Sequence, residues 1–353
     1  MLLRHYFFCI LLFYITTIYS IEYIYPVASL HNGEIIILIH QLSSKHIELL
    51  QWNTQTNTME QILWSLFNPA GFQLLPDNLG FSFIDNGRLR IKAFNKRSPK
   101  AIDFDEPIFN INSLQWINSY SCYCSAQQGD DYALFELYDD GAINAIASYP
   151  HKDCIYPQKI DLLLFYIERD KSTLNNTVSH IMQAHYPEEH NNNAALSAHM
   201  IIDFQNSPII FLNMQSHQEG FVIEHSQTID TADTTISFVY HHFIKNNDIW
   251  DTQKLFSFTI PSSLLIQGTD ESLYESILPL LPRVIHNKVY FVTCTPNNNT
   301  LEPYCYDMTT KTNNKIILEP TIQGHCFVPM LCGNKFYCGG TQQVGQPLIY
   351  FLT

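Results

Sequence analysis

The chain has 353 residues, of which 46% are hydrophobic and only 15% are charged, and its formal net charge is -14 at pH 7. This composition excludes an intrinsically disordered chain, because such chains are poor in apolar residues and rich in charge. The negative charge also excludes general binding to nucleic acid, since it would repel the phosphate backbone.

The first residues have the pattern of a secretory signal peptide. Arg4 precedes an apolar run at residues 6–15, and the small residue Ser20 follows where a signal peptidase would cut. The run is shorter than the roughly 20 apolar residues that a membrane-spanning helix needs, so an uncleaved anchor is only the alternative. We therefore predict a signal peptide at residues 1–20, no membrane span after its removal, and a secreted or periplasmic protein.

Behind this segment, a hairpin-like pattern recurs about every 40 to 45 residues until the chain ends. In the clearest unit, two alternating segments at residues 80–85 and 89–94 flank Asn86-Gly87. Alternation of period two on either side of Asn-Gly is the strongest short-range signal for a β-hairpin. With a short strand on each side, the unit is predicted to be a four-stranded antiparallel meander, and residues 114–147 repeat its order.

Such meanders predict an all-β fold, a β-propeller. A single meander cannot bury both faces, so successive units stack and close radially. About eight hairpins follow one another along the chain, and the sixth is poorly spaced and fits into the fifth unit. We therefore predict about seven blades, with six to eight possible. An unpaired strand at residues 21–25 is expected to close the ring by pairing with the C-terminal strands, which makes residues 21–353 a single domain. A two-sheet sandwich or two tandem all-β domains are the alternatives.

From Tyr25 onward, this series of hairpins resembles the extracytoplasmic β-propeller superfamily of the TolB-like or WD40-like kind. No repeat has a Gly-His pair followed by Trp-Asp at the spacing of WD40 repeats, and the double glycine of kelch blades occurs once, at Gly339-Gly340. Members of the superfamily mostly bind proteins or act as scaffolds. The resemblance therefore implies a protein or small ligand bound at a loop face or in a central channel.

Three basic residues, Arg88, Arg90 and Lys92, alternate along one face of a predicted strand. One interpretation is a solvated outer strand whose positive charge discourages pairing with another sheet edge. The other is a docking patch for an anionic partner.

Three acidic residues, Asp103, Asp105 and Glu106, precede Pro107 in a predicted loop between blades. Carboxylates at such a place serve either as general acid and base on a glycan or as calcium ligands. Ordinary turn aspartates are the alternative, because Asp is a preferred turn residue.

Motifs for catalysis are missing elsewhere in the sequence. No Gly-x-Ser-x-Gly elbow, phosphate-binding loop or dinucleotide fingerprint occurs. We therefore favour an exported scaffold that binds a protein or ligand, without catalysis and without a cofactor. A glycan-active or calcium-dependent enzyme that uses the loop acids is the second hypothesis, and an unspecified surface role is the third.

Nine cysteines are present, one of them in the signal segment, so an even number remains in the exported chain. Export makes disulfides accessible. Cys294 and Cys305 flank an Asn-rich turn, and Cys332 and Cys338 bracket a second turn, with Cys326 as a competing partner. Reduced thiols that pack as small hydrophobic groups are the alternative. A zinc site is disfavoured because no C-x-x-C pair occurs.

Overall fold

The computed structural model describes most of the chain. The described residues are 22–30, 33–41, 46–67, 70–76, 80–85, 88–94, 96, 98, 100–104, 109–170, 178–185, 197–204, 208–225, 235–262, 280–295, 298–318, 324–342 and 349–352. The predicted signal peptide at residues 1–20 lies outside them. None of the described segments is a helix long and apolar enough to cross a membrane.

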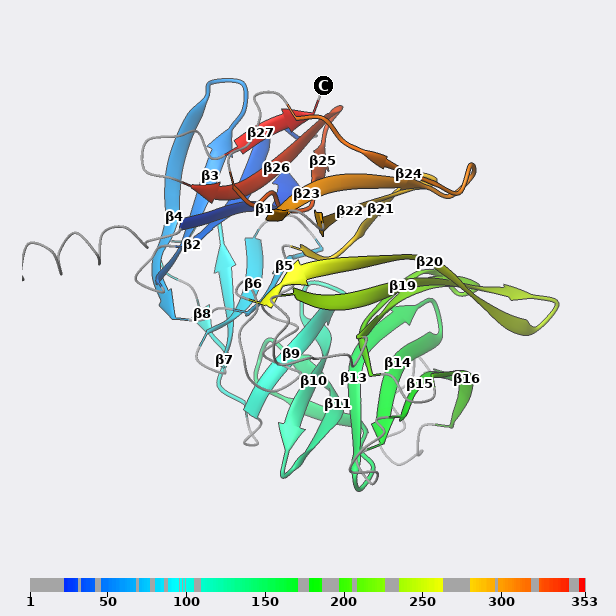
Figure 1. Cartoon of the computed structure of the whole chain (residues 1–353). Coiled ribbons are helices and arrows are strands. Elements are labelled where there is room, and N and C mark those ends of the chain that lie inside the picture. The colour runs from blue at the N-terminus through cyan, green and yellow to red at the C-terminus, as the bar shows by residue number, and fades with distance from the viewer. Residues whose placement is uncertain are drawn as a thin grey trace, which may run out of the picture. The chain divides into compact units, whose positions relative to one another are not determined.

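The strands form six antiparallel sheets, which are the blades of a β-propeller (Figure 1). The all-β prediction is confirmed, and six blades fall within the expected range. The chain divides into two compact units. Unit 1 takes its described residues from Met1–Asn68, Pro279–Thr295 and Thr300–Thr353, and unit 2 takes them from Pro69–Leu278 and Pro296–Asn299.

Unit 2 contains four sheets of four strands each, in chain order. The strands are β5 (Ala70–Leu74), β6 (Gly80–Asp85), β7 (Arg88–Ala93) and β8 (Lys100–Ala101); β9 (Phe109–Trp116), β10 (Ser121–Gln128), β11 (Asp131–Tyr138) and β12 (Ile143–Ala147); β13 (Lys152–Ile160), β14 (Leu163–Asp170), β15 (Val178–His185) and β16 (Ala198–Phe204); and β17 (Ile209–Ser216), β18 (Glu219–His225), β19 (Thr235–Asn246) and β20 (Ile249–Pro261).

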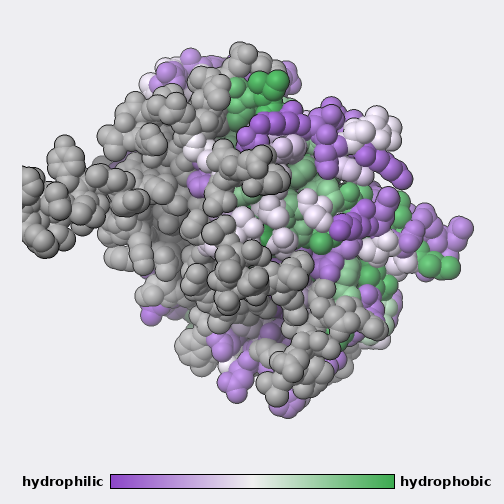
Figure 2. Space-filling model, viewed as in Figure 1, coloured by the Kyte–Doolittle hydropathy of each residue, from purple (hydrophilic) through white to green (hydrophobic). Residues whose placement is uncertain are grey.

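The predicted meanders are confirmed in unit 2. Asp85 pairs with Arg88, so two residues connect β6 and β7, as the Asn-Gly pattern predicts, although that turn lies outside the described residues. The fifth and sixth predicted hairpins form one sheet, β17 to β20. The tip of the long β19–β20 hairpin brings apolar residues to the surface beside polar ones, and Ile249 there is 71% exposed (Figure 2).

Unit 1 contains two sheets, and the larger one joins the two ends of the described chain. Its strands are β1 (Glu22–Leu30), β2 (Ile35–Gln41), β3 (His46–Asn53), β4 (Thr58–Phe67), β25 (Met330–Cys332), β26 (Lys335–Gln342) and β27 (Ile349–Leu352). The second sheet is β21 (Arg283–Ile285), β22 (Lys288–Thr295), β23 (Asn298–Asp307) and β24 (Thr312–Lys315).

The N-terminal strand pairs with a C-terminal strand, as predicted. Ile24 of β1 lies opposite Gly340 of β26, while β27 pairs with the other end of β26. This pairing explains why the blades number six. The last hairpin, counted from the sequence as a separate blade, belongs to the same sheet as the first four strands.

The inner strands β11 and β14 are buried on both faces. In β11 and β14 every residue except the first and last is buried, whereas β12, at the edge of its sheet, is mostly accessible. Phe135 and Phe165 are at most 1% exposed. Burial of one such side chain contributes about 1.5–3 kcal/mol, so packing on two faces supplies the main stabilising term.

Successive sheets of unit 2 are also held by a repeated side-chain contact, which we call the glutamine clasp. Near the end of the first strand of a sheet, a glutamine accepts a hydrogen bond from a backbone N–H of the first strand of the next sheet. The three clasps are Gln73 Oε1 with Trp116 N at 3.1 Å, Gln115 Oε1 with Lys159 N at 2.6 Å, and Gln158 Oε1 with Met214 N at 2.7 Å. Unit 1 has a related contact, since Arg283 Nη2 donates to the carbonyl of Pro26 at 3.3 Å.

Candidate functional site

The three basic residues lie on β7, which is not an edge strand because it pairs with both β6 and β8. Arg88 is exposed and Arg90 is half-buried, but Lys92 is only 3% exposed. The Lys92 ammonium donates to the carbonyls of Ala93 at 2.9 Å and Lys96 at 2.5 Å, and burial lowers its pKa. Lys92 thus satisfies backbone carbonyls of the next turn instead of facing solvent with the two arginines.

Of the three predicted acids, only Asp103 is described, because Asp105 and Glu106 lie outside the described residues. The Asp103 carboxylate is 86% exposed and lies 3.9 Å from the Arg88 guanidinium, which is 66% exposed. A surface pair of this kind contributes about 0–1 kcal/mol. Across the described part of the chain, no group of three or more His, Cys, Asp or Glu side chains is placed to hold a metal ion.

The described cysteines are all free thiols, so neither predicted disulfide is formed. Cys294 lies at the end of β22 next to the turn, whereas Cys305 lies near the far end of β23, so they are not opposite each other. Cys332 packs in a cluster with Ile24, and Cys338 packs in a different cluster with Leu318. Neither predicted pair is therefore placed for a bond, and Cys332 and Cys338 pack as small hydrophobic groups.

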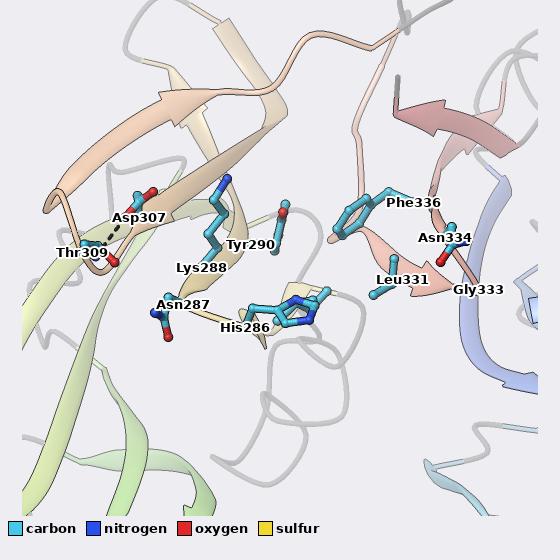
Figure 3. A pocket seen from close by; sticks show the side chains of 11 residues that line it. His286, Asn287, Lys288, Tyr290, Asp307, Thr309, Leu331, Gly333, Asn334 and Phe336 are labelled. Carbon is cyan, nitrogen blue, oxygen red and sulfur yellow. Dashed lines mark hydrogen bonds between the residues drawn. The ribbon is translucent and has the colours of Figure 1, made fainter. Parts of the chain in front are cut away.

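A groove of about 780 Å³ opens among three hairpin turns of unit 1 (Figure 3). His286-Asn287 connects β21 to β22, residues 308–311 connect β23 to β24, and Gly333-Asn334 connects β25 to β26. All three turns, or the strand ends beside them, line the groove. No sequence motif marked this place, because its three parts come from separate hairpins.

The floor of the groove is apolar and partly accessible. Its residues are Ile285, Tyr290, Leu331 and Phe336. The Tyr290 and Phe336 rings lie with their centroids 4.7 Å apart and their planes at 34°. Burial raises the pKa of Tyr290, so its hydroxyl remains protonated and the two rings present a neutral aromatic surface.

The rim of the groove is polar and exposed. Its side chains are His286, Asn287, Lys288, Thr309 and Asn334. Figure 3 shows Tyr290 and Phe336 next to each other, above His286 and Leu331 in this view. Among the described residues, the side chains of His286, Lys288 and Asn334 have no hydrogen-bond or ion-pair partner. These donors remain available to a bound molecule.

Asp307 fixes the β23–β24 turn at one side of the groove. Its Oδ1 accepts hydrogen bonds from the backbone N–H groups of Thr310 at 3.0 Å and Thr309 at 2.9 Å. These two bonds, with a smaller effect from Lys288, hold the pKa of Asp307 below its usual range. The carboxylate therefore stays ionised and orders the turn.

The opposite side of the groove is fixed by close backbone packing. Gly33 has φ 89°, and a Cβ placed there would overlap the backbone nitrogen of Gly333. Only glycine permits this approach of the β1–β2 connection to the β25–β26 turn. His286 also has a positive φ, 55°, which is uncommon outside glycine and is often found at functional sites.

A comparison with known protein families gives no match, and neither does a comparison with curated protein sequences. Solved structures do match. A prolyl endopeptidase has a TM-score of 0.57 and 10% identity over 94% of this chain and 46% of its own. The β-propeller domain of the Trilobed protease from Pyrococcus furiosus has a TM-score of 0.50 and 8% identity over 92% and 96%. TolB from Acinetobacter baumannii has a TM-score of 0.45 and 9% identity over 87% and 65%.

The chain therefore spans about half of the endopeptidase and less than two thirds of TolB. Because all of these identities are low, the likenesses establish the fold alone and transfer no activity. The predicted resemblance to β-propeller proteins is confirmed as an architecture. The fold defines the chain as a β-propeller, and the groove is its candidate binding site.

Proposed function

We propose that this protein is an exported β-propeller scaffold that binds a peptide segment of a partner protein in the groove of unit 1. The observation that carries the proposal is the combination of the Tyr290–Phe336 aromatic floor with unpaired donors on the rim. Protein-binding sites commonly have an apolar, aromatic centre inside a polar rim, and the aromatic residues supply most of the binding energy.

The chemistry of the groove favours a peptide. The aromatic floor takes an apolar or proline side chain, while Lys288 and Asn334 donate to backbone carbonyls or to a carboxylate of the ligand. A volume of about 780 Å³ is within the usual range for a site that encloses a small ligand or a short chain segment. A net charge of -14 disfavours nucleic acid as the partner.

Export is part of the proposal and rests on the sequence of residues 1–20. Removal of this segment after Ser20 leaves Ile21 directly before β1 (Glu22–Leu30), the strand that pairs with β26. The site of action would then be periplasmic or extracellular. Sequencing the N-terminus of the exported protein tests this part, and a protein that begins at Met1 in the membrane fraction would contradict it.

The second candidate function is a glycan-active or calcium-dependent enzyme that uses Asp103, Asp105 and Glu106. One observation favours it: the Asp103 carboxylate is largely exposed, so a ligand can approach it. The groove does not contribute to this hypothesis, because Asp103 belongs to unit 2 and the groove lies in unit 1.

The two functions are separated by a binding screen with matched variants. The wild-type protein is panned against a displayed library of random peptides and is tested in parallel with an oligosaccharide panel and with calcium. We expect enriched peptides whose binding is lost in Phe336→Ala and kept in Lys254→Ala, a control at an exposed position of β20. Oligosaccharide or calcium binding that is lost in Asp103→Asn, with no enriched peptide, would favour the second function and contradict the first.

A further inference from the structure

A pair of buried cysteines brackets the segment that forms one wall of the groove. Cys326 is 1% exposed and Cys338 is fully buried, and both pack in one cluster with Leu318. The backbone around Cys326 is fixed on two sides. Its N–H donates to the carbonyl of Leu301 at 3.1 Å, and the N–H of Phe327 donates to the carbonyl of Gly339 at 2.9 Å.

The two cysteines are diagonal neighbours across an antiparallel bridge. Cys326 lies opposite Gly340, and Cys338 precedes Gly340 by two residues on β26. Residues two apart on a strand point to the same face, so both side chains lie on one side. Gly340 has no side chain to separate them. The two thiols are close enough for Cys338 to act on the pKa of Cys326.

We propose that Cys326 and Cys338 form a disulfide bond when the protein folds in an oxidising compartment. Two S–H bonds break and one S–S bond forms. Two electrons and two protons pass to a disulfide of a thiol–disulfide oxidoreductase or to oxidised glutathione, which leaves as two thiols. The predicted export of the chain places it where such an acceptor is present.

The bond forms before the segment is fully buried. Burial, together with the neighbouring Cys338, raises the pKa of Cys326 well above its usual range, so the folded pair holds almost no thiolate. Thiolate is the species that attacks a disulfide. Exchange during folding, followed by burial, gives a structural bond that resists reduction.

Other cysteines of unit 1 are poorly placed to compete. Cys332 packs against Ile24 in a separate cluster, with Ser29 and Arg283 as its neighbours. Cys305 lies next to the hydroxyl of Tyr290. The pairing of Cys326 with Cys338 therefore takes up Cys326, the competing partner that the sequence offered, in place of Cys332.

The bond would clamp one side of the groove. The segment between Cys326 and Cys338 carries Leu331, Gly333, Asn334 and Phe336 of the groove lining. A covalent link between its ends restricts the unfolded chain and holds this wall in place. This effect on ligand binding rests on the proposed function, whereas the bond itself does not.

The test is a peptide map of the whole exported protein. Free thiols are alkylated under denaturing conditions, and the digest is read by mass spectrometry without reduction. We expect one cross-linked pair that contains Cys326 and Cys338, with Cys122, Cys124 and Cys154 alkylated. Alkylation of both Cys326 and Cys338, or linkage of either one to Cys332 or Cys305, would overturn the proposal.

Thermal unfolding gives a second readout with a matched control. Protein that has been unfolded, reduced and refolded with reductant present is expected to have a midpoint about 4 °C below that of the oxidised wild type, as for a disulfide that closes a short loop in a domain of this size. Cys326→Ala should not respond to reductant, and Cys332→Ala should respond like the wild type. If no peptide binds the groove but the cross-link is found, the proposed function fails and the disulfide stands.

Discussion

Polar side chains serve opposite purposes in the glutamine clasps of unit 2 and at the groove rim of unit 1. In unit 2, the glutamine clasps direct side-chain amides into the backbone of the next sheet, and Gln158 uses both its oxygen and its nitrogen, since Nε2 also donates to the carbonyl of Leu212 at 2.9 Å. In the groove of unit 1, Lys288 and Asn334 make no such contact among the described residues. Polar groups that complete the fold are not available to a ligand. The Lys288 and Asn334 side chains remain available to bind one.

Substitutions in the glutamine clasps and at the groove rim should therefore separate stability from binding. A clasp substitution should weaken folding and leave the groove chemistry unchanged. A rim substitution should weaken binding and leave folding unchanged.

The largest effect on stability is expected for Gln158→Ala. The change removes two hydrogen bonds and leaves the N–H of Met214 and the carbonyl of Leu212 without partners. We expect a loss of about 2–3 kcal/mol in the free energy of unfolding. Gln253→Ala, at an exposed position of β20, is the control and should change it by less than about 0.5 kcal/mol. Equal effects of the two substitutions in urea unfolding would show that the clasp does not hold the sheets.

Phe336→Ala is expected to have a smaller effect on folding. The ring is half-buried and rests on Tyr290, so we expect a loss of about 1–2 kcal/mol from the smaller buried apolar surface and the lost ring contact. Phe336→Leu, which keeps most of the volume, should lose less stability while still weakening binding. A loss as large as that of Gln158→Ala would mean that Phe336 serves mainly the core.

The pH dependence of stability is expected to have a contribution from His325 in unit 1. Its Nδ1 accepts a hydrogen bond from the N–H of Leu301 at 3.2 Å, and burial lowers its pKa below the ordinary value of 6.5. The unfolded chain therefore binds a proton more readily than the folded one. This contribution is present above about pH 6.5 and decreases as the pH falls below it.

His325→Gln separates this contribution from the rest of the acid response. Because glutamine does not titrate, the thermal midpoint of the variant should fall less steeply than that of the wild type between pH 7 and pH 5. Parallel midpoints of the two proteins over this range would exclude a role for His325.

The smallest effect on folding is expected for the rim. Lys288→Ala combined with Asn334→Ala removes two exposed side chains without partners, so the free energy of unfolding should change by less than about 0.5 kcal/mol. Urea unfolding measures this directly. A clear loss of stability would mean that the rim, like the clasp, completes the fold.

The sequence predicted the hairpins well because their signals are local. Asn86-Gly87 and the alternation around it specify β6, β7 and their register without reference to distant residues. The sequence also predicts the pairing of β1 with the C-terminal strands, but local patterns do not show that the first and last hairpins share one sheet. A count of hairpins therefore gave about seven blades where the structure has six.

Side-chain roles were harder to predict. Alternation placed Lys92 on the same face as Arg88 and Arg90, yet Lys92 is buried because carbonyls of the next turn accept from its ammonium. The clasp glutamines did leave a signal, since Gln73, Gln115 and Gln158 recur at nearly the spacing of the blades. The groove left none, because three turns from different hairpins form it.

The groove of unit 1 is the proposed binding site for the partner. The direct test is titration calorimetry of the best-enriched displayed peptide against the wild type, the Lys288→Ala and Asn334→Ala double variant, and Lys254→Ala. We expect the double variant to bind about tenfold more weakly or worse, which corresponds to about 1.4 kcal/mol, while Lys254→Ala binds like the wild type. Equal affinity for all three proteins would contradict the assignment of the groove as the binding site.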